Sequence, residues 1–215
     1  GFKLIDKNLI KNERLISKFS YKKINTFIDK LFLDNLVESV VQIGANDGKR
    51  FDVLNIFIKK YSPKAILVEP IKENFIDLKL NYKGQNNIFF ENSAISVNNE
   101  INFLFKVDEQ KLKLYDEHVK GISSFNKSHL LKHGVSKFHI VKEKVNSISF
   151  NELIKKYSIE NLDLLMIDAE GYDGDIIIDF LLNSSLRPLI VFEYLHIKNI
   201  VFKKLINTLI SKNFV

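Results

Sequence analysis

The sequence predicts an α/β fold with a mostly parallel sheet, flanked by helices. Short apolar runs rich in Val and Ile recur along the chain, and amphipathic stretches of helical periodicity separate them. This alternation is typical of βαβ units. The length of 215 residues, with 46% apolar and 27% charged residues, fits one core.

The composition excludes several classes of protein. The chain has no Cys, so disulfide frameworks, thiolate metal sites and Cys nucleophiles are excluded, and a reducing, cytoplasmic location is expected. No uncharged apolar run approaches the roughly 18 residues that a membrane-spanning helix needs. We therefore predict no membrane span.

Residues 1–36 are expected to form a helical extension before the main domain, residues 37–215. Residues 1–30 carry eight basic and three acidic residues, which supply most of the net charge of +6. Apolar residues recur there at helical spacing: Ile24, Phe27, Ile28, Leu31 and Phe32. The helix should pack on the domain or on a second subunit, which would give a homo-oligomer. Nucleic acid is not the favoured partner, because the whole chain has three Arg residues.

The sequence of the first half of the domain predicts three parallel strands and two helices. The strands are expected at 39–43, 65–69 and 88–91, and the helices at 51–60 and 74–82. Pro70 ends the second strand, because proline has no N–H to donate to a strand ladder.

The second half predicts an added strand, an insertion and two more core strands. Residues 100–107 alternate apolar and polar residues, as an added antiparallel strand would. Residues 108–135 show weak periodicity and carry His118, His129 and His133, so we expect an insertion or lid that binds substrate. The remaining expected strands are 138–145, 162–168 and 189–193, and the helices are 150–157, 176–181 and 199–212. Ser149 and Glu152 predict a capping box.

Ligands of open α/β sheets bind at the carboxyl ends of the strands. Here the first strand leads into a loop with two glycines, Gly44 and Gly48, and the second ends in Glu69. A carboxylate at that position accepts both hydroxyls of a ribose, as in NAD or S-adenosylmethionine. Asn46 and Lys49 stand where a dinucleotide fingerprint needs glycine, so NAD is not favoured.

Six segments in order make the chain similar to the FkbM family of S-adenosylmethionine-dependent methyltransferases. They are residues 40–48 (VVQIGANDG), 68–70 (VEP), 92–95 (NSAI), 121–124 (GISS), 167–173 (IDAEGYD) and 192–196 (FEYLH). The resemblance implies a Rossmann-like class I methyltransferase fold. It also implies methyl transfer to hydroxyl oxygens, often of sugars or secondary metabolites.

The resemblance further implies a binding site for S-adenosylmethionine. Gly44, Ala45, Asn46, Asp47 and Gly48 would surround the methionine part, and Glu69 would hold the ribose. Ser93 and Ala94 would lie beside the adenine, and Asp168 at the junction of cofactor and acceptor. Two features depart from the family: Gln42 replaces a frequent Asp, and two further C-terminal strands are expected to be truncated.

The segment after the fourth core strand supplies four carboxylates within eight positions. Asp168, Glu170 and Asp173 are candidate catalytic residues, together with Glu193 and His196 after the fifth strand. Glu170 or Asp173 acts as general base or acceptor clamp, or several of these oxygens hold Mg²⁺, which we favour less. Alternatively, Asp173 and the nearby Asp175 stabilise the helix N-terminus.

No metal site is favoured from the sequence. His129 and His133 have helical i, i+4 spacing, but no H-E-x-x-H motif surrounds them. His196 is either a proton acceptor or a structural residue. Ser123 and Ser124 either hydrogen-bond substrate hydroxyls or cap the following helix.

The sequence therefore predicts an O-methyltransferase that acts on a small molecule, sugar or glycan. One alternative is an RNA methyltransferase that uses the basic N-terminal helix. The other is a non-catalytic module of the same fold that docks through this helix.

Overall fold

A computed structural model describes residues 21–50, 52–97 and 103–214. Its centre is a five-stranded parallel sheet in the order β10-β9-β1-β2-β3. The strands are β1 (Ser39–Ile43), β2 (Lys64–Val68), β3 (Ile88–Glu91), β9 (Leu164–Ile167) and β10 (Leu189–Phe192). The predicted parallel α/β fold is confirmed, and the order places β1 between the two halves of the sheet.

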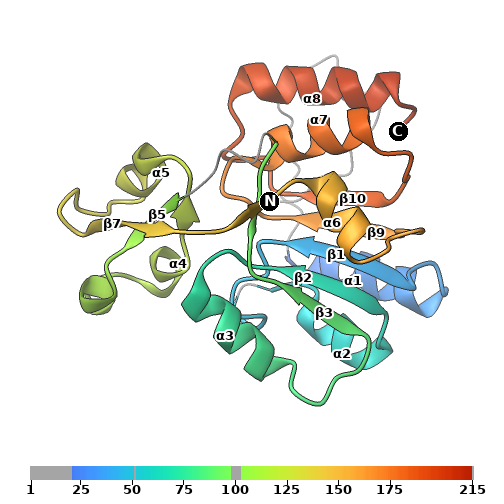
Figure 1. Cartoon of the computed structure of the whole chain (residues 1–215), viewed down its shortest axis with the longest axis horizontal. Helices are drawn as coiled ribbons and strands as arrows, with labels where there is room; N and C mark the ends of the chain where they lie inside the picture. The colour runs from blue at the N-terminus through green and yellow to red at the C-terminus, as the bar shows by residue number, and fades with distance from the viewer. Residues whose placement is uncertain (1–20, 51, 98–102, 215) are drawn as a thin grey trace.

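Helices cover both faces of this sheet (Figure 1). One face packs against α1 (Tyr21–Leu33), α2 (Asn55–Tyr61) and α3 (Lys72–Asn81). The other packs against α6 (Phe150–Lys156), α7 (Asp173–Asn183) and α8 (Asn199–Ser211). Because successive side chains of a strand point to opposite faces, Val40 joins the first cluster and Val41 the second. Both faces are thus buried, as parallel sheets require.

Helix α1 packs on the domain through the apolar residues that its spacing predicted. Ile24, Ile28 and Phe32 are buried, and Phe32 stacks on Tyr61 with ring centroids 5.1 Å apart. Asp29 accepts a hydrogen bond from Tyr61 at 2.8 Å. The basic residues before position 21, on which the RNA alternative depends, lie outside the described residues.

Residues 103–144 form a separate small lobe. Its elements are β5 (Phe103–Val107), η2 (Glu109–Leu114), α4 (Glu117–Lys120), β6 (Ser123–Ser124), α5 (Lys127–Lys132) and β7 (Ile140–Lys144). The antiparallel strand expected at residues 100–107 is present as β5. It pairs with β6 and β7 in a three-stranded sheet that is separate from the central one.

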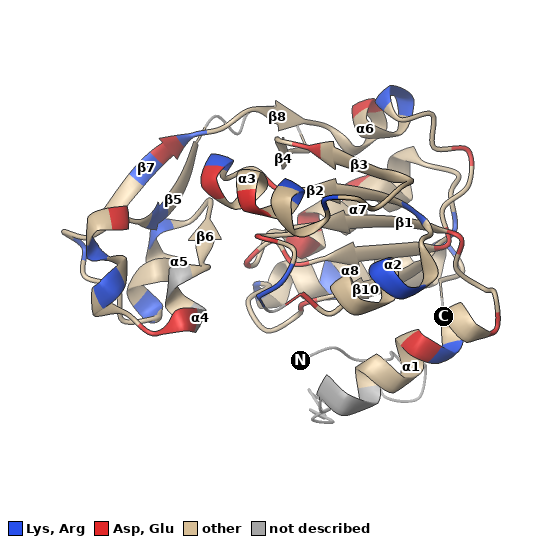
Figure 2. Ribbon diagram, turned by 90° about the horizontal axis from the view of Figure 1, so that it is seen from below, with Lys and Arg blue, Asp and Glu red and all other residues tan. Residues whose placement is uncertain are grey.

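The small lobe stands beside the central sheet in both views (Figures 1 and 2). Two short strands, β4 (Ala94–Ile95) and β8 (Ser147–Ile148), lie at its junction with the domain. Lys106 of the lobe pairs with Glu73 of α3 at 2.9 Å, and also with Glu109 and Glu143. This charged cluster ties the lobe to α3.

Two further observations concern the helices. The predicted capping box on α6 is confirmed, since Ser149 and Glu152 each bond the other's backbone N–H. Within the described ranges, every helix is too short or too polar to cross a lipid bilayer.

Candidate functional site

A cavity lies at the carboxyl ends of β1, β2 and β9, with the small lobe on its other side. Since β2 and β9 flank β1, the loops that follow β1 and β9 leave the sheet in opposite directions, and this switch point is where α/β sheets bind ligands. The main domain contributes most of the lining, including Gly44, Glu69 and Asp168. The lobe contributes Leu104, Gly121, Ser123 and Phe125.

The glycine loop is held tightly between the neighbouring strands. The N–H groups of Gly44 and Ala45 both donate to the carbonyl oxygen of Val68, at 3.0 Å. Gly44 has φ +79°, and a Cβ there would overlap the carbonyl oxygen of Asp168. Only glycine fits this position, so the backbone itself forms the wall of the cavity.

Two residues of the predicted cofactor loop do not line the cavity. Asp47 accepts hydrogen bonds from the backbone of Lys49 and Arg50, and from Arg50 Nε at 2.6 Å. Burial alone would raise the pKa of Asp47. The hydrogen bonds outweigh this effect, so the pKa of Asp47 lies below its usual value. Gly48 faces Leu78 and Tyr82 of the α3 region. Both residues shape the loop, whereas Gly44, Ala45 and Asn46 line the cavity.

Glu69 is buried beneath the cavity and connects two loops. Its Oε2 accepts from the Asn46 N–H and its Oε1 from the Ile71 N–H, both at 2.9 Å. Burial raises the pKa of Glu69 to about 7, and the hydrogen bonds limit that rise. The Asn74 side chain also hydrogen-bonds this carboxylate, so only part of its acceptor capacity is left for a ligand.

Gln42 and Asp52 form a polar pair at the methionine end of the predicted site. Gln42 Nε2 donates to Asp52 Oδ1 at 3.0 Å. Gln42 is buried, and its Oε1 has no hydrogen-bond partner within the described parts of the chain. Burial also raises the pKa of Asp52. The sequence did not single out Asp52, although its place shortly after the glycine loop was a usable signal.

Ser93 and Ala94, predicted beside the adenine, both line the cavity. Ser93 Oγ donates to Glu91 Oε1 at 2.7 Å, and Glu91 also pairs with Lys156 at 2.6 Å. Burial raises the pKa of Glu91, but these bonds and that from Tyr157 hold it below its usual value. Glu91 therefore fixes the position of Ser93 from outside the cavity.

Asp168 and Glu170 lie at the end of the cavity next to β9. Asp168 is exposed on the cavity wall. Its enclosure by protein raises its pKa to about 7, and the charges of Glu170 and Glu193 act in the same direction. Glu170 Oε2 lies 2.8 Å from His129 Nε2. Carboxylates thus concentrate negative charge at this end.

Asp173 does not share this exposure. It is completely buried and accepts hydrogen bonds from the N–H groups of Ala169 and Gly171, each at 3.1 Å. Burial raises its pKa to about 7. A base or acceptor clamp must reach the substrate, so Asp173 fits the alternative role of organising the loop that begins α7. Asp175 follows it in the first turn of this helix.

Glu193 and His196 follow β10 and lie beside Glu170 rather than in the cavity lining. His196 Nε2 is 3.7 Å from Glu193 Oε2. Burial raises the pKa of Glu193 to about 7, and burial lowers the pKa of His196. His129 and His133 approach His196 from the small lobe, with ring centroids 4.5 and 5.3 Å from it. The i, i+4 spacing of His129 and His133 was the one local signal for this cluster, because the other members lie on the loops after β9 and β10.

The small lobe also contacts the loop after β9 directly. Phe125 packs edge-on against Tyr172, with centroids 4.8 Å apart. Ser124 Oγ donates to the carbonyl oxygen of Glu170 at 3.3 Å, while Ser123 faces the cavity. The lobe therefore covers the same end of the cavity at which Asp168 and Glu170 lie.

Known proteins are similar to this chain at the level of a family and of the fold. Residues 42–215 match the methyltransferase FkbM domain. No curated protein matches the chain. Among solved structures, the Methanococcus jannaschii fibrillarin pre-rRNA processing protein is similar at 13% identity, with a TM-score of 0.39.

That alignment covers 82% of this chain and 56% of the fibrillarin chain, so this chain spans little more than half of that relative. The domain match, in contrast, extends over most of the sequence and includes the glycine loop, Glu69 and the loops after β9 and β10. The chain belongs to the methyltransferase FkbM family.

Proposed function

We propose that this chain transfers a methyl group from S-adenosylmethionine to a hydroxyl oxygen of a small molecule, sugar or glycan. The observation that carries the proposal is the cavity at the switch point, which combines a buried carboxylate after β2 with an unpartnered amide oxygen on β1. Family membership supports the methyl transfer.

The residues of the cavity fit S-adenosylmethionine. Glu69 offers carboxylate lone pairs to the ribose hydroxyls, and Ser93 and Ala94 border the space for the adenine. Gln42 lines the cavity, and its Oε1 has no partner among the residues that the structure describes, so we infer that this oxygen accepts a hydrogen bond from the cofactor's ammonium group. A buried acceptor without a partner costs about 1–3 kcal/mol, and this contact would remove that cost.

The charge of the lining supports the same cofactor. Asp52, Glu69, Asp168 and Glu170 all line the cavity. S-adenosylmethionine carries a sulfonium and an ammonium group, which these carboxylates attract. Arg50 also lines the cavity, but its guanidinium is paired with Asp47 at 2.6 Å, so the lining as a whole favours a cationic ligand over an anionic one.

Asp168 is the residue we assign to the acceptor, because it is exposed on the cavity wall beside Glu170. When bound, the cofactor would supply an electrophilic methyl group, which the acceptor oxygen attacks in line with the C–S bond, and S-adenosylhomocysteine is the leaving group. Asp168 accepts a hydrogen bond from the acceptor hydroxyl, which orients the oxygen. It takes the proton as the new C–O bond forms and the C–S bond breaks. The lobe residues Ser123 and Phe125 border the acceptor and help to exclude water.

Calorimetric titration with S-adenosylhomocysteine tests the cofactor assignment. The unmodified chain should bind one equivalent, and Gln42→Met should weaken binding by about tenfold, since a hydrogen bond to a charged group is worth about 1.5 kcal/mol or more. Glu69→Ala should abolish detectable binding. Absence of binding to a folded, unmodified chain would overturn the proposal.

Asp163→Asn provides the matched control. The Asp163 carboxylate also accepts hydrogen bonds from backbone N–H groups, those of Glu38 and Ser39, but it lies at the amino ends of β9 and β1 and does not line the cavity. Its substitution should lower stability and leave the affinity for S-adenosylhomocysteine within about threefold of the original. Asp168→Asn should keep this affinity and remove methyl transfer to a panel of hydroxylated acceptors.

A further inference from the structure

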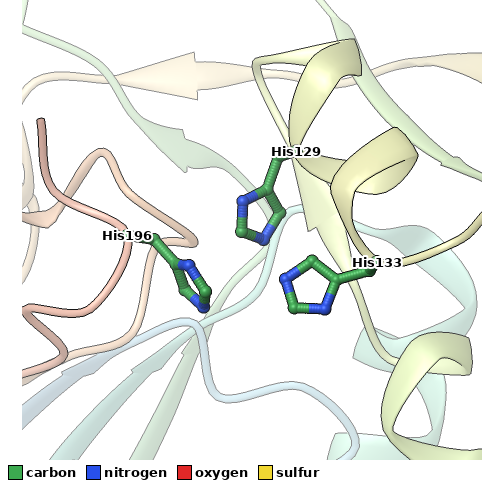
Figure 3. A group of neighbouring side chains, drawn as sticks. All are labelled: His129, His133 and His196. Atoms are coloured by element: carbon green, nitrogen blue, oxygen red, sulfur yellow. The ribbon is translucent and has the colours of Figure 1, made fainter.

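Five potential metal ligands converge at the boundary between the small lobe and the main domain. His129 lies on α5, and His133 directly follows this helix. Glu170 comes from the loop after β9, and Glu193 and His196 come from the loop after β10. Figure 3 shows the three imidazole rings facing one another, with His196 opposite the two lobe residues.

These residues form two groups of three that share His196, and each group has the spacing of a potential metal site. Potential ligand atoms of His129, His133 and His196 all lie within 4.8 Å of one another, and those of Glu170, Glu193 and His196 do as well. Glu170 Oε2 and His129 Nε2 are 2.8 Å apart, the distance of a hydrogen bond. Two ligands of a tetrahedral ion, each at about 2.1 Å, are about 3.4 Å apart, so an ion would replace this hydrogen bond with two metal–ligand bonds. Small side-chain rotations would therefore complete the coordination.

The charges in the cluster favour a cation. Glu170 and Glu193 place carboxylate oxygens within 4.8 Å of a ring nitrogen of His196. Imidazole nitrogens and carboxylate oxygens are both ligands of divalent transition-metal ions. A divalent ion would satisfy both, because it accepts the imidazole lone pairs and neutralises the carboxylates.

We propose that His129, His133, His196 and Glu170 bind one divalent transition-metal ion of the Zn²⁺ class, with Glu193 as the neighbouring carboxylate. Imidazole ligands select Zn²⁺, Co²⁺ or Ni²⁺ over Mg²⁺, which prefers oxygen. The site differs from the Mg²⁺ site considered for the carboxylates after β9, because three of its four ligands are nitrogens.

The proposed ion has two structural consequences. It links α5 of the lobe to two loops of the main domain, so it closes the lobe over the cavity. Glu170 also lines the cavity, which places the ion at the acceptor end. Metal binding does not depend on the proposed methyl transfer, so an experiment can contradict either proposal without contradicting the other.

The test uses the full chain after treatment with a chelator. Calorimetry with Zn²⁺ should give one ion per chain, and Co²⁺ should produce visible absorption bands that Zn²⁺ removes and millimolar Mg²⁺ does not. His133→Gln and His196→Gln should each weaken binding by about 10–100-fold or more. His139→Gln is the matched control, since His139 lies in the same lobe but bonds to the Tyr115 hydroxyl.

Three results would overturn the proposal. They are no Co²⁺ bands with the unmodified chain, equal affinity in the unmodified chain and both cluster variants, or an equal loss in His139→Gln. Glu170→Gln keeps the shape of the side chain and provides a second variant if a histidine variant does not fold. Affinity for S-adenosylhomocysteine, measured on the same samples without metal, reports separately on the proposed function.

Discussion

The carboxylate of Glu69 accepts hydrogen bonds from the backbone of two loops, so its protonation affects stability as well as binding. Burial raises its pKa to about 7, from an ordinary value of 4.5. The folded chain therefore holds a proton between these pH values that the unfolded chain has released. Because the native state binds more protons, this group's contribution to stability falls as the pH rises from about 4.5 to 7.

Urea unfolding at pH 5 and pH 8 tests this reasoning. Deprotonation of Glu69 alone should make the free energy of unfolding at pH 8 lower than that at pH 5 by on the order of 2 kcal/mol. Glu69→Gln removes the titrating group, so the decrease should be smaller in this variant by about that amount. An unchanged difference between pH 5 and pH 8 would show that Glu69 does not titrate in this range.

At the scale of single residues, the sequence predicted the cavity better than the histidine cluster. Gly44, Glu69 and Asp168 were identified because each follows a core strand, and parallel strands bring their ends together. His129 and Glu170 are 41 positions apart, and no local spacing connects them. Their contact depends on how the small lobe packs, which no periodicity in the sequence encodes.

Among the elements, α1 is part of the core of the main domain. Ile28 is completely buried within the cluster that includes Phe57 of α2, whereas Leu33 on the same helix is 60% exposed. Ile28→Ala should therefore lower the free energy of unfolding by about 3 kcal/mol, and Leu33→Ala by less than about 0.5 kcal/mol. Urea denaturation of the two variants measures the difference. Equal effects would mean that α1 does not pack in this way.

The core strands could be predicted from the sequence, whereas the two shortest elements of the lobe, β6 and α4, could not. Strands β1, β2 and β9 are nearly continuous apolar runs, which the burial of both sheet faces requires. In contrast, β6 has two residues and α4 has four, which is too short for a periodicity to appear. Their stability comes from packing around Leu130 and Val135, within the lobe itself.

At the scale of the whole molecule, the charged cluster around Lys106 controls how the lobe is held. Lys106 is 15% exposed and pairs with three carboxylates, of which Glu73 belongs to α3. In Lys106→Met these carboxylates would repel one another. We expect amide hydrogen exchange in the lobe to accelerate by about tenfold, because a partly buried pair is worth on the order of 1 kcal/mol.

Hydrogen exchange followed by mass spectrometry, with and without S-adenosylhomocysteine, measures this effect. Lys111 is exposed and provides the control. The lobe amides of Lys111→Met should exchange at the same rate as those of the unmodified chain. The five core strands should keep their protection in both variants. Unchanged exchange in the lobe of Lys106→Met would show that this charged cluster does not hold the lobe.

The lobe has its own apolar cluster around Val119, Ile122 and Leu130, separate from the two clusters on the faces of the main sheet. Substitutions within that cluster therefore leave the packing of the main domain intact. Under the proposed function, exchange of residues 103–144, a segment of about forty residues, would change the acceptor side of the cavity, whereas Gly44 and Glu69 of the main domain would stay in place.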